Sequence, residues 1–92
     1  MVESGFIYIL KINGKKTFYI GSTINLERRL SEHKRGKVAS TKPYLPLELV
    51  FKQKCSSYAQ ARALELKLKK FKRKDYLEQI IQDGIIKSLL PS

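Results

Sequence analysis

The fold is decided by residues 6–21, FIYILKINGKKTFYIG, in which two β-prone segments flank Asn13-Gly14. Asn-Gly in this setting is the strongest short-range signal of a β-hairpin, because both residues tolerate the positive φ of a type I′ turn. If Asn13 and Gly14 alone form the loop, Tyr8 pairs directly with Tyr19 across the two strands. We therefore expect a hairpin with its turn at Asn13-Gly14.

The two faces of this hairpin differ in chemistry, because successive side chains of a strand point to opposite faces. One face is apolar and suits a core; its members are Ile7, Ile9, Phe18 and Ile20. The other face sets two phenols beside a glycine; its members are Phe6, Tyr8, Tyr19 and Gly21. This arrangement predicts that one face of the hairpin packs in a core and that the other face contributes to a functional site.

A helix is expected after the hairpin, with Asn25 as its N-cap, Leu26 and Leu30 on its apolar stripe, and Gly36 beyond its end. Residues 37–46 are predicted to be a basic loop, because Pro43 and Pro46 exclude regular structure. A third strand is predicted over residues 47–54. Its alternation places three apolar side chains on one face: Leu47, Leu49 and Phe51.

Two more helices follow in the prediction. Ser57 and Gln60 have capping-box spacing, and an apolar stripe with helical spacing comes next: Ala61, Leu64, Leu68 and Phe71. Asp75 with Glu78 predicts the start of the third helix, which ends at Gly84. The apolar residues after it either cover the sheet or form a partner surface. The predicted fold is an α/β (α+β) sandwich of one domain, residues 1–92, with a core over residues 5–84 and a C-terminal tail over 85–92.

The composition supports a folded chain of one domain. It has 92 residues, of which 42% are hydrophobic. No apolar run approaches the roughly 18 residues of a membrane span, and the N-terminus does not read as a signal peptide. The single Cys55 excludes an internal disulfide and fits a reducing compartment. We therefore expect a cytoplasmic protein.

The charge balance points to a polyanionic partner. Nineteen Lys and Arg against eight Asp and Glu give a formal net charge of +11, and nucleic acid is the commonest partner of so basic a domain. An anionic membrane is the rival partner, but no basic amphipathic terminal helix supports it. A merely soluble basic protein is the remaining alternative.

Three sets of residues have the chemistry of phosphodiester hydrolysis. Glu65 borders an apolar stripe, where a carboxylate is costly unless it is paired or holds a cation such as Mg²⁺; the alternative is an ordinary ion pair with Lys69. Arg29 and His33, four residues apart, share a helix face, and an arginine fork suits phosphate oxygens. The alternative is a solvated face.

The two tyrosines form the third set. A phenol has an ordinary pKa near 10, so Tyr8 or Tyr19 needs nearby cations to act as a base; the alternative is a packed cross-strand pair. Gly21 either lets the backbone approach phosphate or simply ends a strand. Further candidates for nucleic-acid contact carry positive charge or a hydroxyl group; they are Arg28, Lys37, Ser40, Thr41, Lys42, Lys69 and Lys70.

These residues together resemble a known family, the GIY-YIG nuclease domains. Phe6-Ile7-Tyr8 stands where the family has Gly-Ile-Tyr, with Gly5 one place early, and Tyr19-Ile20-Gly21 matches fully. Further matches follow in the family's order and spacing; they are residues 25–30 (NLERRL), Glu32-His33, Glu65 and residues 68–70 (LKK). Residues 36–42 (GKVASTK), followed by Leu49-Val50, also resemble the small stand-alone bacterial members. The chain is similar to small stand-alone bacterial members and to the N-terminal nuclease domain of the excision-repair nuclease C subunit.

The resemblance implies a three-stranded antiparallel sheet flanked by helices and a DNA endonuclease that leaves a 5′-phosphate and a 3′-hydroxyl. It further implies that Glu65 holds one Mg²⁺ or Mn²⁺, that Tyr19 is the general base and that Arg29 contacts the scissile phosphate, with Tyr8 and His33 in support. Flaps, nicks or branches would then select the target, or partner proteins would. A non-catalytic binding module, or a subunit of a DNA repair or mobile-element complex, remains the alternative.

Overall fold

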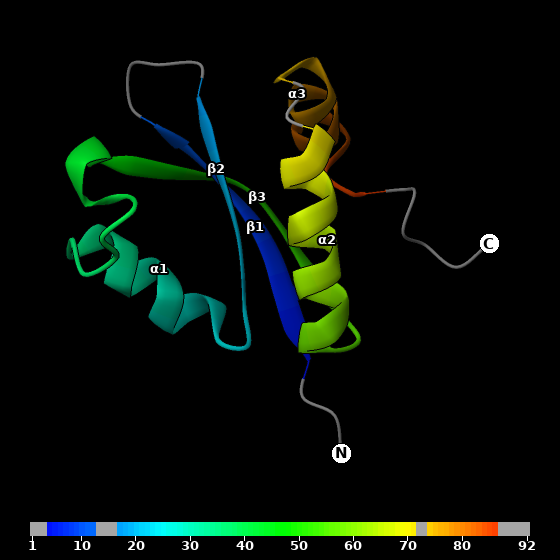
Figure 1. The fold of residues 1–92 in the computed structure, drawn as a ribbon, viewed down its shortest axis with the longest axis horizontal. Helices are drawn as coiled ribbons and strands as arrows, with labels where there is room; N and C mark the ends of the chain where they lie inside the picture. The colour runs from blue at the N-terminus through cyan, green and yellow to red at the C-terminus, as the bar shows by residue number, and fades with distance from the viewer. Residues whose placement is uncertain (1–3, 13–16, 72–73, 87–92) are drawn as a thin grey trace.

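β1 (Gly5–Ile12) is the central strand of a three-stranded antiparallel sheet in the order β2-β1-β3 (Figure 1). The computed structural model describes residues 4–12, 17–71 and 74–86. The other elements, in chain order, are β2 (Phe18–Thr23), α1 (Leu26–Lys34), the 3₁₀ turn η1 (Lys42–Tyr44), β3 (Leu47–Cys55), α2 (Tyr58–Phe71) and α3 (Lys74–Asp83). The predicted α+β architecture is thereby confirmed.

The hairpin register differs from the prediction by two residues. Tyr8 pairs with Gly21, and Tyr19 pairs with Leu10. The Ile12 amide donates to the Thr17 carbonyl at 3.0 Å, so the loop spans residues 13–16 and not Asn13-Gly14 alone. The proposed type I′ turn itself lies outside the described residues. Because the shift is even, every side chain keeps its predicted face.

A β-bulge corrects the predicted face of β3. Ile9 of β1 pairs with Phe51, whereas Leu10 pairs with Leu49, so Val50 is one extra residue on β3. An extra residue reverses the alternation beyond it. Phe51 is therefore buried in the apolar core, on the opposite face from Leu49, which is half-exposed.

The apolar face of the sheet is covered by α2 and α3. The Ser57 hydroxyl caps α2 by accepting from the Gln60 amide at 3.1 Å, as its spacing predicts. The helix contributes a buried stripe whose described members are Ala61, Leu64 and Leu68; the side chain of Phe71 lies outside the described residues. Burying each such leucine stabilises the fold by about 1.5–3 kcal/mol.

α3 and the segment after it complete this layer. Asp75 lies within the first turn of α3 and not before it, which corrects its predicted place as the start of the helix. Gly84 ends the helix at a positive φ of 75°. Of the apolar tail, Ile86 is buried in the core, and its amide donates to the Gln53 side chain at 2.8 Å; residues 87–92 lie outside the described range. This residue therefore covers the sheet.

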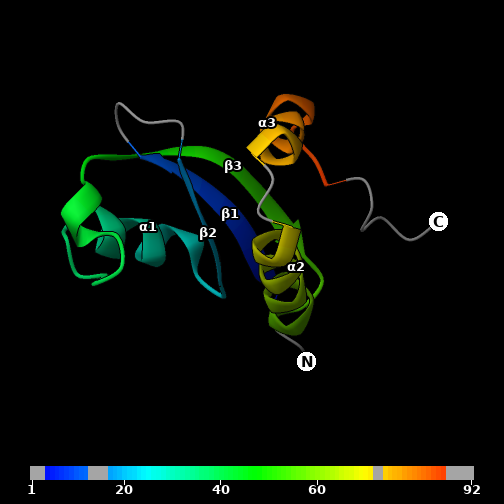
Figure 2. The same cartoon turned by 45° about the horizontal axis from the view of Figure 1, so that its top comes forward.

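The opposite face of the sheet is covered by α1 and the segment that follows it, as the turned view shows (Figure 2). Asn25 caps α1 by accepting from the Arg28 amide at 3.0 Å. Gly36, at a φ of 73°, ends the helix, and the next amide, that of Lys37, bonds back to the Glu32 carbonyl at 2.9 Å. The prediction that residues 37–46 lack regular structure was wrong for η1, where Pro43 fits the first turn of a 3₁₀ helix.

No helix within the described ranges is long and apolar enough to cross a membrane.

Candidate active site

The candidate residues gather around β2, the edge strand that lies between α1 and α2 in Figure 1. Tyr19 projects from β2 toward the α1 side, where its ring stands edge-on to the His33 ring with centroids 5.2 Å apart. Ser22, on the opposite face of the same strand, donates a hydrogen bond to Glu65 on α2. The edge strand therefore connects two groups of residues that are distant in sequence.

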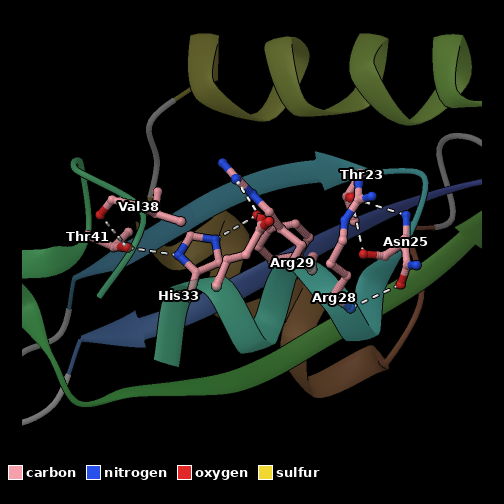
Figure 3. Close-up of polar contacts among 9 residues, drawn as sticks. Thr23, Asn25, Arg28, Arg29, His33, Val38 and Thr41 are labelled. Carbon is pink, nitrogen blue, oxygen red and sulfur yellow. Dashed lines mark hydrogen bonds and ion pairs between the residues drawn. The ribbon is translucent and has the colours of Figure 1, made fainter. Parts of the chain in front are cut away.

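A buried hydrogen-bonded chain begins at Tyr8. Its hydroxyl lies 2.8 Å from His33 Nε2, and His33 Nδ1 lies 2.8 Å from the Thr41 hydroxyl. Thr41 in turn donates to the Val38 carbonyl at 3.4 Å (Figure 3). Tyr8, His33 and Thr41 are each at most 2% exposed. Because Thr41 gives its hydrogen to a carbonyl, His33 must carry its proton on Nδ1, and Tyr8 must donate to Nε2.

Burial sets the protonation of this chain. Removal from water raises the pKa of Tyr8 to about 12, even though a hydrogen bond from Arg29 opposes the rise. Burial, together with the nearby Arg29 charge, lowers the pKa of His33 to about 4. Near neutral pH, Tyr8 is therefore a protonated phenol and His33 is a neutral imidazole, in agreement with the hydrogen-bond directions above.

Arg29 reaches the site from the same helix as His33. The two side chains extend from α1 on the same side (Figure 3), as their four-residue spacing predicts. The guanidinium is close enough to Tyr8 and Tyr19 for its charge to act on both phenols. It also donates to Glu32 at 3.2 Å, and its side chain is 36% exposed. Arg29 is thus held against both tyrosines while part of its fork faces solvent, where phosphate oxygens could bind.

Glu65 is a buried carboxylate surrounded by donors. Only 5% of it is exposed. Oε2 lies 2.6 Å from Lys69 Nζ and 3.1 Å from Arg62 Nη1, and Oε1 accepts from Ser22. Burial by itself would raise the pKa of Glu65, but the hydrogen bonds from Lys69, Ser22 and Arg62 outweigh it and lower that pKa. Glu65 is therefore ionised, and the ion pair with Lys69 that the spacing suggested is present on a buried group.

The two halves of the site meet at Lys69. Its ammonium binds Glu65 and also lies 5.8 Å from the centroid of the Tyr19 ring. Tyr19 in turn is 6.5 Å, centroid to centroid, from Tyr8. Carboxylate, ammonium and two phenols therefore occupy one continuous region along β2.

These residues fit a single divalent cation. Within the described ranges no three His, Cys, Asp or Glu side chains cluster to form a cage of protein ligands. Mg²⁺, however, is usually bound by one or two carboxylates and retains several waters. Glu65 is ionised and offers two carboxylate oxygens, so a hard cation that displaced a basic partner could bind there with water and phosphate as its other ligands.

Comparison with known proteins matches this arrangement to a family. The model of the GIY-YIG catalytic domain matches residues 4–78, which include both tyrosines, Arg29, His33 and Glu65. The chain belongs to the GIY-YIG family. This membership supports a nuclease-type function, and a nucleic acid is the substrate class it implies.

Relatives of similar size were also found for this GIY-YIG domain. It is 34% identical over 84 residues to a UPF0213 protein of Syntrophus aciditrophicus, a match that covers 89% of this chain and 95% of the relative. A UPF0213 protein of Staphylococcus haemolyticus is 36% identical and covers 82% and 92% of the two chains. A UPF0213 protein of Streptococcus pneumoniae is 31% identical, in a match that covers 98% of this chain and 90% of the relative. No solved structure gives a significant match.

The residues predicted to contact nucleic acid occupy varied positions in this GIY-YIG domain. Most are exposed on α1, on α2 or on the segment between α1 and β3; they are Arg28, Lys37, Ser40, Lys42, Lys69 and Lys70. Thr41 has a different place, because it is 1% exposed and bonds His33, so its hydroxyl is not available to phosphate. Gly21 is buried against Tyr8.

Two site residues, Ser22 and Arg62, were missed in the sequence. Ser22 follows Gly21 directly and bonds Glu65, and Arg62 lies three residues before Glu65 on α2 and pairs with it. The spacing of Arg62 is that of an ordinary helical ion pair, which could have revealed it. Nothing local in the sequence relates Ser22 to a residue 43 positions later.

Proposed function

We propose that this chain is a metal-dependent endonuclease that hydrolyses DNA phosphodiester bonds. The observation that carries the proposal is the convergence, along one strand edge, of an ionised buried carboxylate, an arginine fork and two phenols. These groups match what phosphodiester hydrolysis needs: a base for water, a positive partner for the phosphate and a ligand for a cation. The charge of +11 supports a nucleic-acid substrate.

Tyr19 is the proposed general base, and it takes a proton from the attacking water at its phenolic oxygen. Such a base needs nearby cations, and two are present: the Lys69 ammonium lies 5.8 Å from the centroid of the Tyr19 ring, and Arg29 interacts electrostatically with Tyr19. Tyr8 is less suited to this role, because burial holds it protonated with its hydrogen directed at His33. Its proposed role is to hold Arg29 in place.

Arg29 binds and orients the scissile phosphate in this proposal, since a planar fork can hold two phosphate oxygens at once. Glu65 is the proposed ligand of one Mg²⁺ or Mn²⁺. When bound, such a cation supplies Lewis-acid stabilisation of the phosphate. His33 positions Tyr8 through Nε2.

The test is a cleavage assay on plasmid, single-stranded, flap and branched DNA, each with Mg²⁺, Mn²⁺ or EDTA. Glu65→Gln keeps the shape of the side chain and removes its charge, and Glu48→Gln, at an exposed position of β3, is the matched control. We expect cutting that requires the metal, persists in Glu48→Gln and is lost in Glu65→Gln. Cutting in EDTA, or full activity of Glu65→Gln, would refute the metal-dependent mechanism.

A nucleic-acid-binding module without turnover is the second candidate function. The ion pairs on Glu65 favour it, because two basic side chains already neutralise the proposed metal ligand. The same assay separates the two functions. Salt-sensitive DNA binding without cutting under any metal condition would establish the binding module.

A further inference from the structure

Lys69 occupies the approach to the Glu65 carboxylate. Its ammonium lies 2.6 Å from Oε2 and is placed over the Tyr19 ring at 5.8 Å from the centroid. We infer that Lys69 competes with the divalent cation for Glu65, and that nucleic-acid phosphate relieves this competition by drawing Lys69 away. The inference rests on the proposed function and adds to it a control step, in which substrate prepares the cation site.

The competition follows from charge and space. An ammonium in contact with a carboxylate oxygen covers the direction from which a hard cation, with its ligand distance of about 2.0–2.1 Å for Mg²⁺, would approach. Two positive charges so close to each other also repel strongly, because the carboxylate is buried and water screens them poorly. Binding of a cation at Oε2 therefore requires Lys69 to move.

Lys69 is free to move in a way that Glu65 is not. Its side chain is 45% exposed, whereas that of Glu65 is 7% exposed. A lysine side chain has a flexible stem of four carbons, and its ammonium is a point charge that can bind a partner from several directions. If Lys69 leaves, Ser22 still bonds Oε1, and Arg62, at 3.1 Å from Oε2 against 2.6 Å for Lys69, remains as the more distant and weaker competitor. The carboxylate would thus stay ionised and in position.

The phosphate that would attract Lys69 belongs at the neighbouring end of the site. Tyr19 lies beneath the ammonium and beside His33, and the charge of Arg29 also acts on Tyr19. A phosphate on the exposed part of the Arg29 fork would therefore be near Lys69, which binds phosphate as a mobile point charge. Thermodynamic linkage then requires nucleic acid and cation to tighten each other's binding by the same factor.

The experiment measures Mn²⁺ binding by electron paramagnetic resonance, so its readout is independent of cleavage. Every variant carries Tyr19→Phe, which removes the proposed general base and keeps the ring beneath Lys69. The compared proteins are this background, Lys69→Met, Lys69→Arg, Glu65→Gln and the charge-matched control Lys67→Met, at an exposed position of α2. Circular dichroism confirms that each is folded. Binding is measured with Mn²⁺ alone and with a short DNA oligonucleotide.

We expect Lys69→Met to bind Mn²⁺ about tenfold more tightly than the background, and Lys69→Arg and Lys67→Met to bind it about as the background does. We expect DNA to tighten Mn²⁺ binding of the background by roughly fivefold or more, and to have a much smaller effect on Lys69→Met. This pattern would establish the competition and its relief by DNA.

Other outcomes overturn the inference in distinguishable ways. Equal Mn²⁺ affinity of the background and Lys69→Met, with binding lost in Glu65→Gln, refutes the competition and leaves the metal site of the proposed function intact. An undiminished DNA effect in Lys69→Met refutes the relief by phosphate. Absence of Mn²⁺ binding in every protein, including Lys69→Met, refutes both the inference and the proposed metal site.

Discussion

The Tyr8 phenol fills the space that a side chain at Gly21 would need. A Cβ atom at Gly21 would lie 2.4 Å from the Tyr8 hydroxyl oxygen and 2.4 Å from the ring carbon that bears it. The two residues are paired across β1 and β2. Neither can shift easily, because Tyr8 is 1% exposed and its hydroxyl is bonded to His33. Glycine at this position therefore makes the buried phenol possible.

Gly21→Ala is expected to displace Tyr8 and, with it, Arg29. Overpacking of this kind costs about 1–3 kcal/mol of unfolding free energy, and misplacement of the Tyr8–Arg29 pair should lower DNA cleavage by about tenfold or more. Urea denaturation and the cleavage assay measure the two effects. The double variant with Tyr8→Leu should be destabilised by less than the sum of the single variants; strict additivity would mean that the two residues do not interact.

His33 should make the fold sensitive to mild acid. The pKa of His33 is about 4 in the folded protein, against an ordinary value of 6.5, because burial opposes its charge. The unfolded chain takes up a proton below pH 6.5 and the folded chain does not, so stability is complete above that pH and falls as the pH drops toward 4. A complete shift of this size corresponds to about 3.4 kcal/mol, of which about 2–3 kcal/mol is lost by pH 4.5.

Denaturant unfolding at about pH 7.5 and pH 4.5 measures this loss, and His33→Gln is the comparison because it removes the titrating group. The wild-type protein should lose about 2–3 kcal/mol more than His33→Gln between these conditions. Equal losses in the two proteins would show that His33 does not carry the pH dependence.

Thr41 should fix the tautomer of His33. Thr41→Val removes the acceptor of the Nδ1 proton while it keeps the shape of the side chain, and an unsatisfied buried donor costs about 1–3 kcal/mol. Thr41→Ser keeps the hydroxyl and should cost less. The chain has one histidine, so its imidazole ¹⁵N signals are unambiguous in the NMR spectrum. They should show the Nδ1–H form in the wild type and in Thr41→Ser; the Nε2–H form in the wild type would contradict the assigned hydrogen-bond directions.

Arg29 should be irreplaceable by lysine. Arg29→Lys keeps the charge but loses the planar fork that holds Tyr8 and, in the proposed function, two phosphate oxygens. We expect both Arg29→Lys and Arg29→Ala to lower the cleavage rate by about a hundredfold or more, with Arg35→Lys, at an exposed position just after α1, as the control. Full activity of Arg29→Lys would show that charge alone suffices.

The sequence predicts those parts of the site whose signals are local. Alternation along the hairpin places Tyr8 and Tyr19 on one face, and helical spacing places Arg29 with His33. Both relationships survive an error in register, because a shift of two residues leaves every strand face unchanged.

The remaining features depend on distant parts of the chain. The bulge at Val50 places Phe51 in the core that α2 and α3 cover, and no turn residue marks it in the sequence. Thr41 resembles a phosphate-binding hydroxyl in a basic loop until the chain closes over His33. Its role, like the bond between Ser22 and Glu65, is created by tertiary packing.

The edge position of β2 has a consequence for the shape of molecule that the site can receive. Tyr19 and Ser22 point to opposite faces of the outermost strand. The candidate catalytic groups therefore lie on both sides of a sheet edge and not within a closed pocket. A nucleic-acid strand can bind across such an edge from the side, so the site does not require a free strand end. Covalently closed circles should therefore be attacked as readily as open strands, and the first product from a circle should be a single full-length linear or nicked species.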